Sequence, residues 1–195
     1  MQDTKISNIL SAARKRFAHY GIAKTTMSEI AADIGMSKAS LYYYFPDKER
    51  IFIAVVEQEV GEFLTMIEEL IARPSKPAFK LKKYLSLRNQ MLHNLGNLAK
   101  VENPNPADYF NPLFDELKAR NFKNEKALIE RIFQMGIDEN YFIKFPVDEY
   151  ADFFLNTLRG LRMNILANRQ GESITQKAAE HASLFLEIFL QSISG

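Results

Sequence analysis

Residues 26–48 read TMSEIAADIGMSKASLYYYFPDK, and this stretch decides how the first part of the chain folds. Thr26 followed three residues later by Glu29 is a capping box, which is typical of a helix that begins at the next residue. Gly35 ends this helix, and Ser37 is placed to cap another one directly after it. The stretch therefore predicts two short helices joined by a tight turn.

Helical periodicity continues on both sides of this stretch, because apolar residues recur at a spacing of three to four. The further segments expected to be helical are approximately 6–20, 47–72, 78–94, 107–120, 124–138, 147–169 and 173–193. No segment alternates with a period of two over enough residues to predict a strand. We therefore expect an all-α fold of about nine helices, with a three-helix head at residues 1–46 and a larger helical body at residues 47–195.

A helical wheel divides the second short helix into two faces. Leu41, Tyr44 and Phe45 cluster on one side and are expected to face inward, whereas Ala39 and Tyr43 point outward. An outward face that combines a small residue with tyrosine, serine and lysine is unusual for solvated surface and indicates a partner. A helix-turn-helix of this kind places its second helix in the major groove of DNA.

The distribution of charge agrees with an anionic partner for the head alone. The 195 residues carry 25 Lys and Arg against 24 Asp and Glu, a net charge of +1. Residues 1–50 hold eight basic and five acidic residues, a charge of +3, and the remaining 145 hold 17 basic and 19 acidic ones, a charge of −2. A basic end on a nearly neutral chain favours nucleic-acid binding by that end.

Three motifs within residues 6–52 belong together. They are Ile9-Leu10-x-Ala12-Ala13-x-x-x-Phe17-x-x-x-Gly21, Thr25-Thr26-Met27-x-x-Ile30-Ala31, and Gly35-Met36-Ser37-Lys38-Ala39-Ser40-Leu41-Tyr42-Tyr43-Tyr44-Phe45-x-x-Lys48-Glu49. In these motifs the sequence resembles the TetR family of bacterial transcriptional regulators. Ala39 stands where that family often has Gly, and Tyr44 stands where it often has His.

The resemblance implies that the head is a helix-turn-helix domain that binds a double-stranded DNA operator. The residues then expected at the DNA are Thr26, Ser37, Lys38, Ala39, Ser40, Tyr42, Tyr43 and Lys48. Among them, Thr26 and Lys48 are expected to bind phosphate, and Lys38 and Ala39 are expected to approach the bases. The alternatives are that Thr26 is only a helix cap and that Lys48 is solvated surface.

For the body, the resemblance implies a cavity for an unknown small-molecule effector. The residues expected to line it are Met91, Phe110, Phe114, Phe133, Tyr150 and Phe154, which favours an apolar or aromatic ligand. His93 and Asn156 are candidate polar anchors, and ordinary core packing is the alternative for each aromatic residue.

The last two helices are apolar over wide faces, which favours a homodimer built as a two-fold four-helix bundle. The family has its dimer interface in the same two helices. The residues expected at the interface are Leu158, Leu161, Ile165, Phe185 and Phe189. Intramolecular core is the alternative for such a stripe.

The sequence offers little catalytic chemistry, so we do not expect an enzyme, a cofactor or a metal site. The chain has no Cys, and no two glycines lie closer than 11 residues, which excludes a Gly-rich phosphate loop. No apolar run is long enough to span a membrane, and a cytoplasmic protein is expected. The expected function is a transcriptional repressor that its ligand releases from a palindromic operator. A small all-α enzyme or carrier, or a DNA-binding protein that has lost its ligand, is the alternative.

Overall fold

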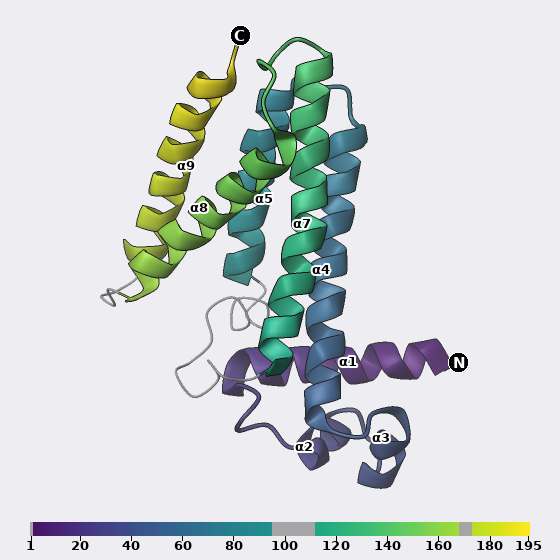
Figure 1. The fold of residues 1–195 in the computed structure, drawn as a ribbon. Helices are drawn as coiled ribbons and strands as arrows, with labels where there is room; N and C mark the ends of the chain where they lie inside the picture. Colours follow the sequence, from purple (N-terminus) through teal and green to yellow (C-terminus); the bar gives the residue numbers. More distant parts are fainter. Residues whose placement is uncertain (1, 95–111, 168–172) are drawn as a thin grey trace. The chain divides into compact units, whose positions relative to one another are not determined.

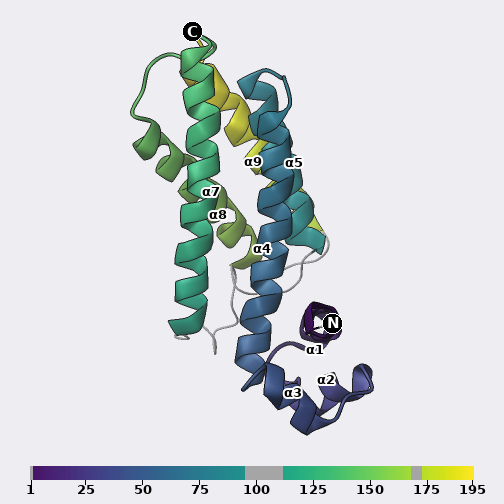
Figure 2. The same ribbon diagram turned by 90° about the vertical axis from the view of Figure 1, so that its right-hand side faces the viewer.

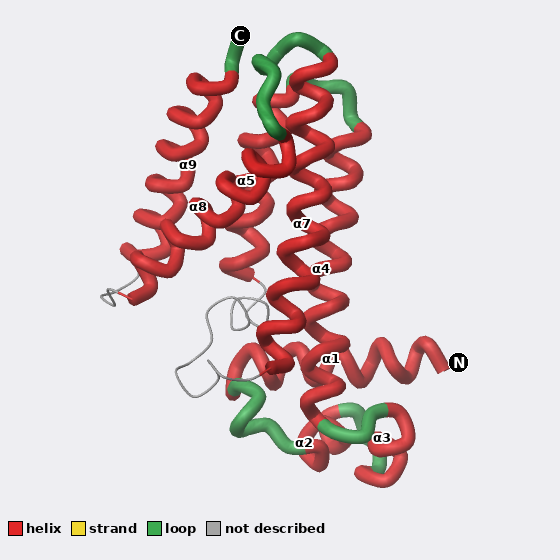
Figure 3. Tube along the Cα trace, in the orientation of Figure 1, coloured by secondary structure: helices red, strands yellow, loops and turns green. Residues whose placement is uncertain are grey.

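A computed structural model describes residues 2–94, 112–167 and 173–195 (Figure 1). These residues form the helices α1 (Gln2–Tyr20), α2 (Met27–Asp33), α3 (Lys38–Tyr44), α4 (Lys48–Ala72), α5 (Pro77–Asn94), α7 (Pro112–Asp138), α8 (Val147–Ala167) and α9 (Ser173–Ile193). Loops and turns make up the rest of the described chain (Figure 3). The prediction of an all-α fold is confirmed, and the eight described helices are close to the nine expected. In the described residues, no helix is both long and apolar enough to cross a membrane.

The chain folds as two compact units that divide within α4, between Glu62 and Phe63. The first unit holds α1, α2, α3 and the first part of α4, and the second holds the remainder of α4 with α5, α7, α8 and α9. The boundary predicted between residues 46 and 47 separates a DNA-binding head from a ligand-binding and dimerisation body, and this division by function stays a prediction.

An apolar core holds the short helices of the first unit. Ile9, Ala13 and Phe17 form the buried side of α1, and the ring of Phe17 meets the ring of Phe52 edge-on at a centroid distance of 5.4 Å. Leu41 of α3 is fully buried as well. Figure 2 shows α1 nearly end-on, with α2 and α3 on the same side of it.

The ends of α2 and α3 form as the sequence predicts. The backbone N–H of Glu29 donates to Thr26 Oγ1 at 3.3 Å, and the backbone N–H of Thr26 donates to Glu29 Oε2 at 2.9 Å, which completes the capping box. The turn between the helices contains Gly35 at φ +63°, a conformation that glycine adopts without strain. Ser37 then accepts a hydrogen bond from the N–H of Ser40 at 3.1 Å as the N-cap of α3.

Aromatic rings from α7, α8 and α9 form the centre of the second unit. Phe133 contacts Phe154 and Phe189 at centroid distances of 5.8 and 5.7 Å, and Phe154 and Phe189 lie 5.2 Å apart. All three rings are buried. The burial of these side chains supplies much of the apolar stabilisation of the unit.

Helix α7 continues through the point where the sequence suggests a break. Two helices were expected, at residues 107–120 and 124–138, and this prediction is wrong for the described residues because Pro112–Asp138 is one helix. Asparagines favour caps and turns in isolation, but residues 121–124 include no Gly or Pro. Asn121 is buried, so packing overrides its weak local preference.

A buried lysine of α5, Lys80, caps the C-terminal end of α4. The Nζ atom of Lys80 donates to the carbonyl oxygens of Leu70, Ile71 and Arg73, with distances of 3.1 Å to Leu70 and 2.8 Å to Ile71. Burial lowers the pKa of Lys80, and the charge of Glu139 opposes this shift. The three hydrogen bonds satisfy carbonyls at the end of α4 that have no partner within the helix.

The segment after α7 folds back onto a glycine. The backbone N–H groups of Tyr141 and Phe142 both donate to the carbonyl of Gly136, at 2.8 and 2.9 Å. A Cβ atom on Gly136 would lie 2.0 Å from the buried ring of Phe142, so the ring can reach this position only because residue 136 lacks a side chain.

Gly136→Ala is therefore expected to destabilise the protein by about 1–3 kcal/mol, because the added methyl group overpacks a filled core. Thermal unfolding followed by circular dichroism measures this effect. Gly61→Ala is the matched control, since a Cβ at this position in α4 meets nothing within 4 Å and alanine favours a helix. Equal melting temperatures for the two variants would contradict the prediction.

Candidate nucleic-acid interface and effector site

Helix α3 presents the face that the wheel predicts. Leu41 is fully buried, and Tyr44 and Phe45 are half-buried, whereas Tyr43 is 79 % exposed. The other side chains predicted to contact DNA are also exposed on this short segment: Ser37, Lys38, Ala39, Ser40 and Tyr42. The structure therefore brings six of the eight predicted residues together on α3 and its cap.

Contacts within this face fix the orientation of its side chains. The ammonium of Lys38 lies 5.8 Å from the centroid of the Tyr42 ring, a cation–π contact. The rings of Tyr43 and Tyr44 meet edge-on at 5.3 Å. Such a surface offers a cation, hydroxyl groups and apolar ring edges, which suit phosphates, sugars and thymine methyl groups.

Thr26 lies at the start of α2, where its role as a helix cap is plain. Its hydroxyl donates to Glu29 Oε2 at 2.8 Å while accepting from the Glu29 N–H. The donations from the side chain and the backbone of Thr26 lower the pKa of Glu29. Thr26 is exposed, and its contact with phosphate stays a prediction.

Arg16 joins α1 to α2, a contact that the sequence reasoning missed. Its Nη2 donates to Asp33 Oδ1 at 2.8 Å, and its Nε donates to Asp33 Oδ2. This two-pronged pair lowers the pKa of Asp33 and raises that of Arg16. Two opposite charges 17 residues apart on predicted helices gave no local signal that they meet.

Lys48, the second predicted phosphate ligand, points into the protein. Its Nζ donates to the carbonyl oxygens of Ile22, Ala23 and Thr25, at 2.8, 3.3 and 3.2 Å. An ammonium has three N–H donors, so these bonds occupy all of them. Lys48 thus holds the loop between α1 and α2 rather than lying on plain solvated surface, and its contact with phosphate stays a prediction.

The predicted walls of an effector cavity divide into three groups. Phe133, Phe154 and Tyr150 belong to one cluster of rings, since Tyr150 lies 6.3 Å from Phe189 and stacks on Phe145 at 4.3 Å. Met91 is buried on α5. Phe110 and the side chains of Phe114 and His93 lie outside the described residues, and Asn156 is exposed on α8.

A buried polar cluster lies between α5, α7 and α8, and the sequence reasoning missed it as well. The Tyr84 hydroxyl and Arg88 Nε both donate to Glu125 Oε1, at 2.6 and 2.9 Å. Burial and the Glu125 carboxylate raise the pKa of Tyr84 well above 10, while the charges of Arg88 and Arg159 oppose this shift. The pairs Tyr84/Arg88 and Asn121/Glu125, each four residues apart on one helix face, were the signal available.

Asn121 adds an open donor to this cluster. The residue is only 9 % exposed, and its Nδ2 has no hydrogen-bond partner among the described residues. A buried amide without a partner costs about 1–3 kcal/mol, which an acceptor atom of a ligand or water relieves. Beside it, the guanidinium of Arg159 lies 4.5 Å from the ring centroid of Phe122.

Two of the five residues predicted for a dimer interface are buried within the chain, and the interface stays a prediction. Leu158 and Phe189 are buried, Leu161 and Phe185 are half-buried, and the side chain of Ile165 lies outside the described residues. Among the side chains of α8 and α9 that the structure describes, the large apolar ones that are exposed are Phe153, Leu184 and Ile188, at 59, 57 and 59 % exposure. The stripe is wide, and a sequence alone does not say which edge the core covers.

Three comparisons bear on the identity of this fold. The family model described as bacterial regulatory proteins, tetR family, matches residues 9–55. The structure of a transcriptional regulator from Cytophaga hutchinsonii is 36 % identical with a TM-score of 0.88, covering 98 % of this chain and 99 % of that one. The uncharacterised HTH-type transcriptional regulator YfiR of Bacillus subtilis is 27 % identical over 98 % of this chain and 94 % of its own length.

A more distant structure shares the fold. SmeT, the repressor of the Stenotrophomonas maltophilia multidrug efflux pump SmeDEF, matches with a TM-score of 0.75 at 18 % identity, covering 97 % of this chain and 90 % of SmeT. SmeT has also been solved in complex with triclosan, which matches with a TM-score of 0.72.

The geometry of Lys48 leads to a prediction about stability. Lys48→Ala is expected to lower the melting temperature by several degrees, because three carbonyls lose a charged donor worth about 1–3 kcal/mol in total. Lys38→Ala is the control, since Lys38 is exposed on α3 and its loss is expected to change stability by less than about 0.5 kcal/mol. Identical melting curves for the two variants would show that Lys48 does not hold the loop.

Proposed function

This chain belongs to the tetR family of bacterial regulatory proteins and is a transcriptional regulator, and we propose that it is a dimeric repressor released from its operator by a small apolar ligand. Each subunit inserts α3 into one major groove of a palindromic site, with half-sites about one helical turn apart or slightly more. Such a regulator acts in the cytoplasm, where the DNA is. The relatives are regulators rather than enzymes, which agrees with a binding function.

The exposed face of α3 carries this proposal. A seven-residue helix that buries Leu41 and exposes Lys38, Tyr42 and Tyr43 has little reason to expose two aromatic rings unless a partner covers them. Ala39 is small enough to let the helix backbone approach the base edges, and Lys38 donates to guanine acceptors. The DNA sugar-phosphate backbone is contacted by the hydroxyls of Ser37 and Ser40 and by the ring of Tyr43.

The exposed apolar face of α8 and α9 supports the dimer. Phe153, Leu184 and Ile188 form a patch that costs free energy in water, and a second copy related by a two-fold axis buries the same patch on both subunits. These three residues replace the buried Leu158 and Phe189 as the central contacts of the proposed interface.

The second unit holds two features that a ligand could use. The rings of Phe133, Tyr150 and Phe154 form an apolar cluster, and the Nδ2 of Asn121, about 18 Å from Phe133 along α7, is a buried donor without a partner among the described residues. SmeT, which shares the fold, binds triclosan, an aromatic compound, and this supports an apolar or aromatic ligand here. Suppose that the ligand binds more tightly to a conformation in which the two α3 helices of the dimer are not spaced to fit the two half-sites. Its binding then shifts the protein toward this conformation and lowers the affinity for DNA.

Binding to a labelled duplex taken from upstream of the protein's own gene tests the DNA-binding function, with fluorescence anisotropy as the readout. Wild-type protein is expected to bind with an affinity that falls as salt rises. Lys38→Ala is expected to lose about 1–3 kcal/mol of discrimination at one base position, measured by competition with single-base variants of the duplex. If no duplex is bound at 50 mM salt, the assignment to DNA fails.

The same anisotropy assay measures whether a ligand releases the protein from the duplex. Triclosan, as the first probe of an aromatic panel, is expected to lower the affinity for the duplex if it is bound in the second unit. A regulator that binds the duplex and is released by no member of the panel would favour the reading that it acts constitutively.

The dimer is tested by sedimentation velocity. The double substitution Leu184→Glu and Ile188→Glu is expected to give a folded monomer, because four carboxylates would meet in the buried two-fold interface. Lys123→Glu with Ala127→Glu places the same substituted residues, at the same spacing of four, on the exposed side of α7 and is expected to leave the dimer intact. A dimer that survives the first substitution would move the interface away from this face.

A further inference from the structure

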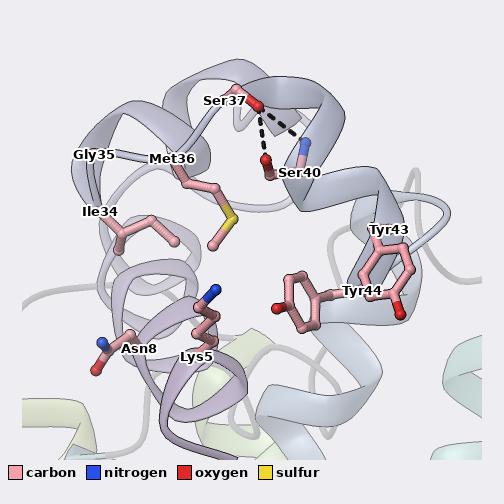
Figure 4. Close-up of a pocket in the computed structure, with 9 residues that line it drawn as sticks. All are labelled: Lys5, Asn8, Ile34, Gly35, Met36, Ser37, Ser40, Tyr43 and Tyr44. Carbon is pink, nitrogen blue, oxygen red and sulfur yellow. Dashed lines mark hydrogen bonds between the residues drawn. The ribbon is translucent and has the colours of Figure 1, made fainter. Parts of the chain in front are cut away.

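An open hollow of about 600 Å³ lies in the first unit, between the start of α1 and the region of α3. Lys5 and Asn8 of α1 line one side, and Ser37, Ser40, Tyr43 and Tyr44 line the other. Figure 4 shows the Lys5 ammonium and the Tyr44 ring pointing toward each other into the hollow. Residues from two helices far apart in sequence are thus brought together on one surface.

Most of the side chains that line the hollow carry hydrogen-bond donors, and Ile34, Gly35 and Met36 make up the rest of the lining. It contains one ammonium, one amide and four hydroxyl groups, and the described residues that line it include no carboxylate. Asp33, the acid nearest to the turn between α2 and α3, is held by the two bonds from Arg16. The local charge therefore favours an anion.

At least one serine hydroxyl at the rim has a hydrogen available for a ligand. Ser37 Oγ and Ser40 Oγ lie 2.8 Å apart and share one hydrogen bond, so the hydrogen of the accepting hydroxyl is left over. Ser37 Oγ also accepts from the Ser40 N–H, which fixes its position. The rim thus presents an oriented donor opposite Lys5.

The helix that carries Lys5 is held in place by packing and by a salt bridge. Ile9 and Phe17 on the same helix are fully buried, and Arg16 ties that helix to α2. Because α1 and α3 belong to one compact unit, the hollow is largely formed before anything binds. A preformed site loses less conformational entropy on binding than a flexible lysine alone.

We propose that this hollow seats a backbone phosphate of the operator and that Lys5 of α1 binds it, which extends the DNA interface beyond the helix-turn-helix. The inference rests on the proposed DNA-binding function, because Ser37, Ser40 and Tyr43 belong both to the hollow and to the face of α3 that contacts DNA. A phosphate carries two charged acceptor oxygens that match the ammonium and the hydroxyl groups. Lys5 contributes affinity without reading sequence.

The salt dependence of DNA binding tests this proposal. Log Kd for a 30-base-pair mixed-sequence duplex is measured against log salt concentration for wild type and for Lys5→Ala. The slope is expected to fall by about one for each subunit bound, and the affinity is expected to weaken several-fold for every duplex alike. Lys5→Arg is expected to keep the wild-type slope. Tyr44→Phe removes only a hydroxyl group, so it is expected to weaken the affinity for DNA while leaving the salt slope unchanged.

Lys15→Ala is the matched control, because Lys15 is exposed on the same helix and does not line the hollow. Melting curves show that each variant is folded. If wild type binds and Lys5→Ala has the same affinity and slope, the phosphate site is overturned while the DNA-binding function stands. Equal losses for Lys5→Ala and Lys15→Ala also overturn it, because general charge then explains the effect. If wild type itself binds no duplex, the proposed function fails instead.

Discussion

Helices α2 and α3 have seven residues each, and helices of this length do not persist in water without support from outside. The proposed DNA-reading surface therefore depends on the contacts that hold these two helices. Buried side chains such as Ile30 and Leu41 supply the apolar part. The capping hydroxyls of Thr26 and Ser37 satisfy N–H groups that a short helix leaves open.

This demand for support divides the basic residues of the first unit into two groups. Arg16 and Lys48 are committed to the protein itself, since one binds Asp33 and the other binds three carbonyls of the loop before α2. Lys38 is exposed on α3, and Lys5 lines the hollow beside it. The Arg16–Asp33 pair already counts as zero in the net charge of +3 at residues 1–50, whereas Lys48 is directed at carbonyls, so the +3 overstates the positive charge presented to DNA. Hydroxyl groups and the exposed tyrosines must carry more of the proposed interface than the count of cations suggests.

Local signals in the sequence predicted the short helices well. The capping box at Thr26, the glycine at the turn and the wheel that turns Leu41 inward all depend on residues within one turn of each other, and the structure agrees with each. The direction of the Lys48 side chain was not predictable, because its partners lie 23 to 26 residues earlier in the chain.

The body was harder to predict because its signals are long-range. Asn121 and Phe122 resembled the start of a break, yet α7 continues through them, and Asn121 is buried one helical turn before Glu125, which pairs with Arg88. Similarly, apolar residues surround so much of α8 and α9 that the pattern did not show that Leu158 and Phe189 are buried within the chain itself. The hydrophobic pattern identifies a wide stripe, and only the packing of neighbouring helices decides which edge of it stays exposed.

The two faces of α8 and α9 are joined through aromatic rings, which constrains how an effector can act. Phe185 contacts the buried Phe154 and Phe189 at 5.7 and 5.6 Å and the exposed Phe153 at 6.2 Å. A ligand that inserts among the inner rings must therefore displace rings that also border the proposed dimer face, because packed interiors leave little free volume. In the proposed dimer, such a displacement changes the contact between subunits. The ring of Phe185 is thus the physical link between the inner aromatic cluster and the exposed Phe153.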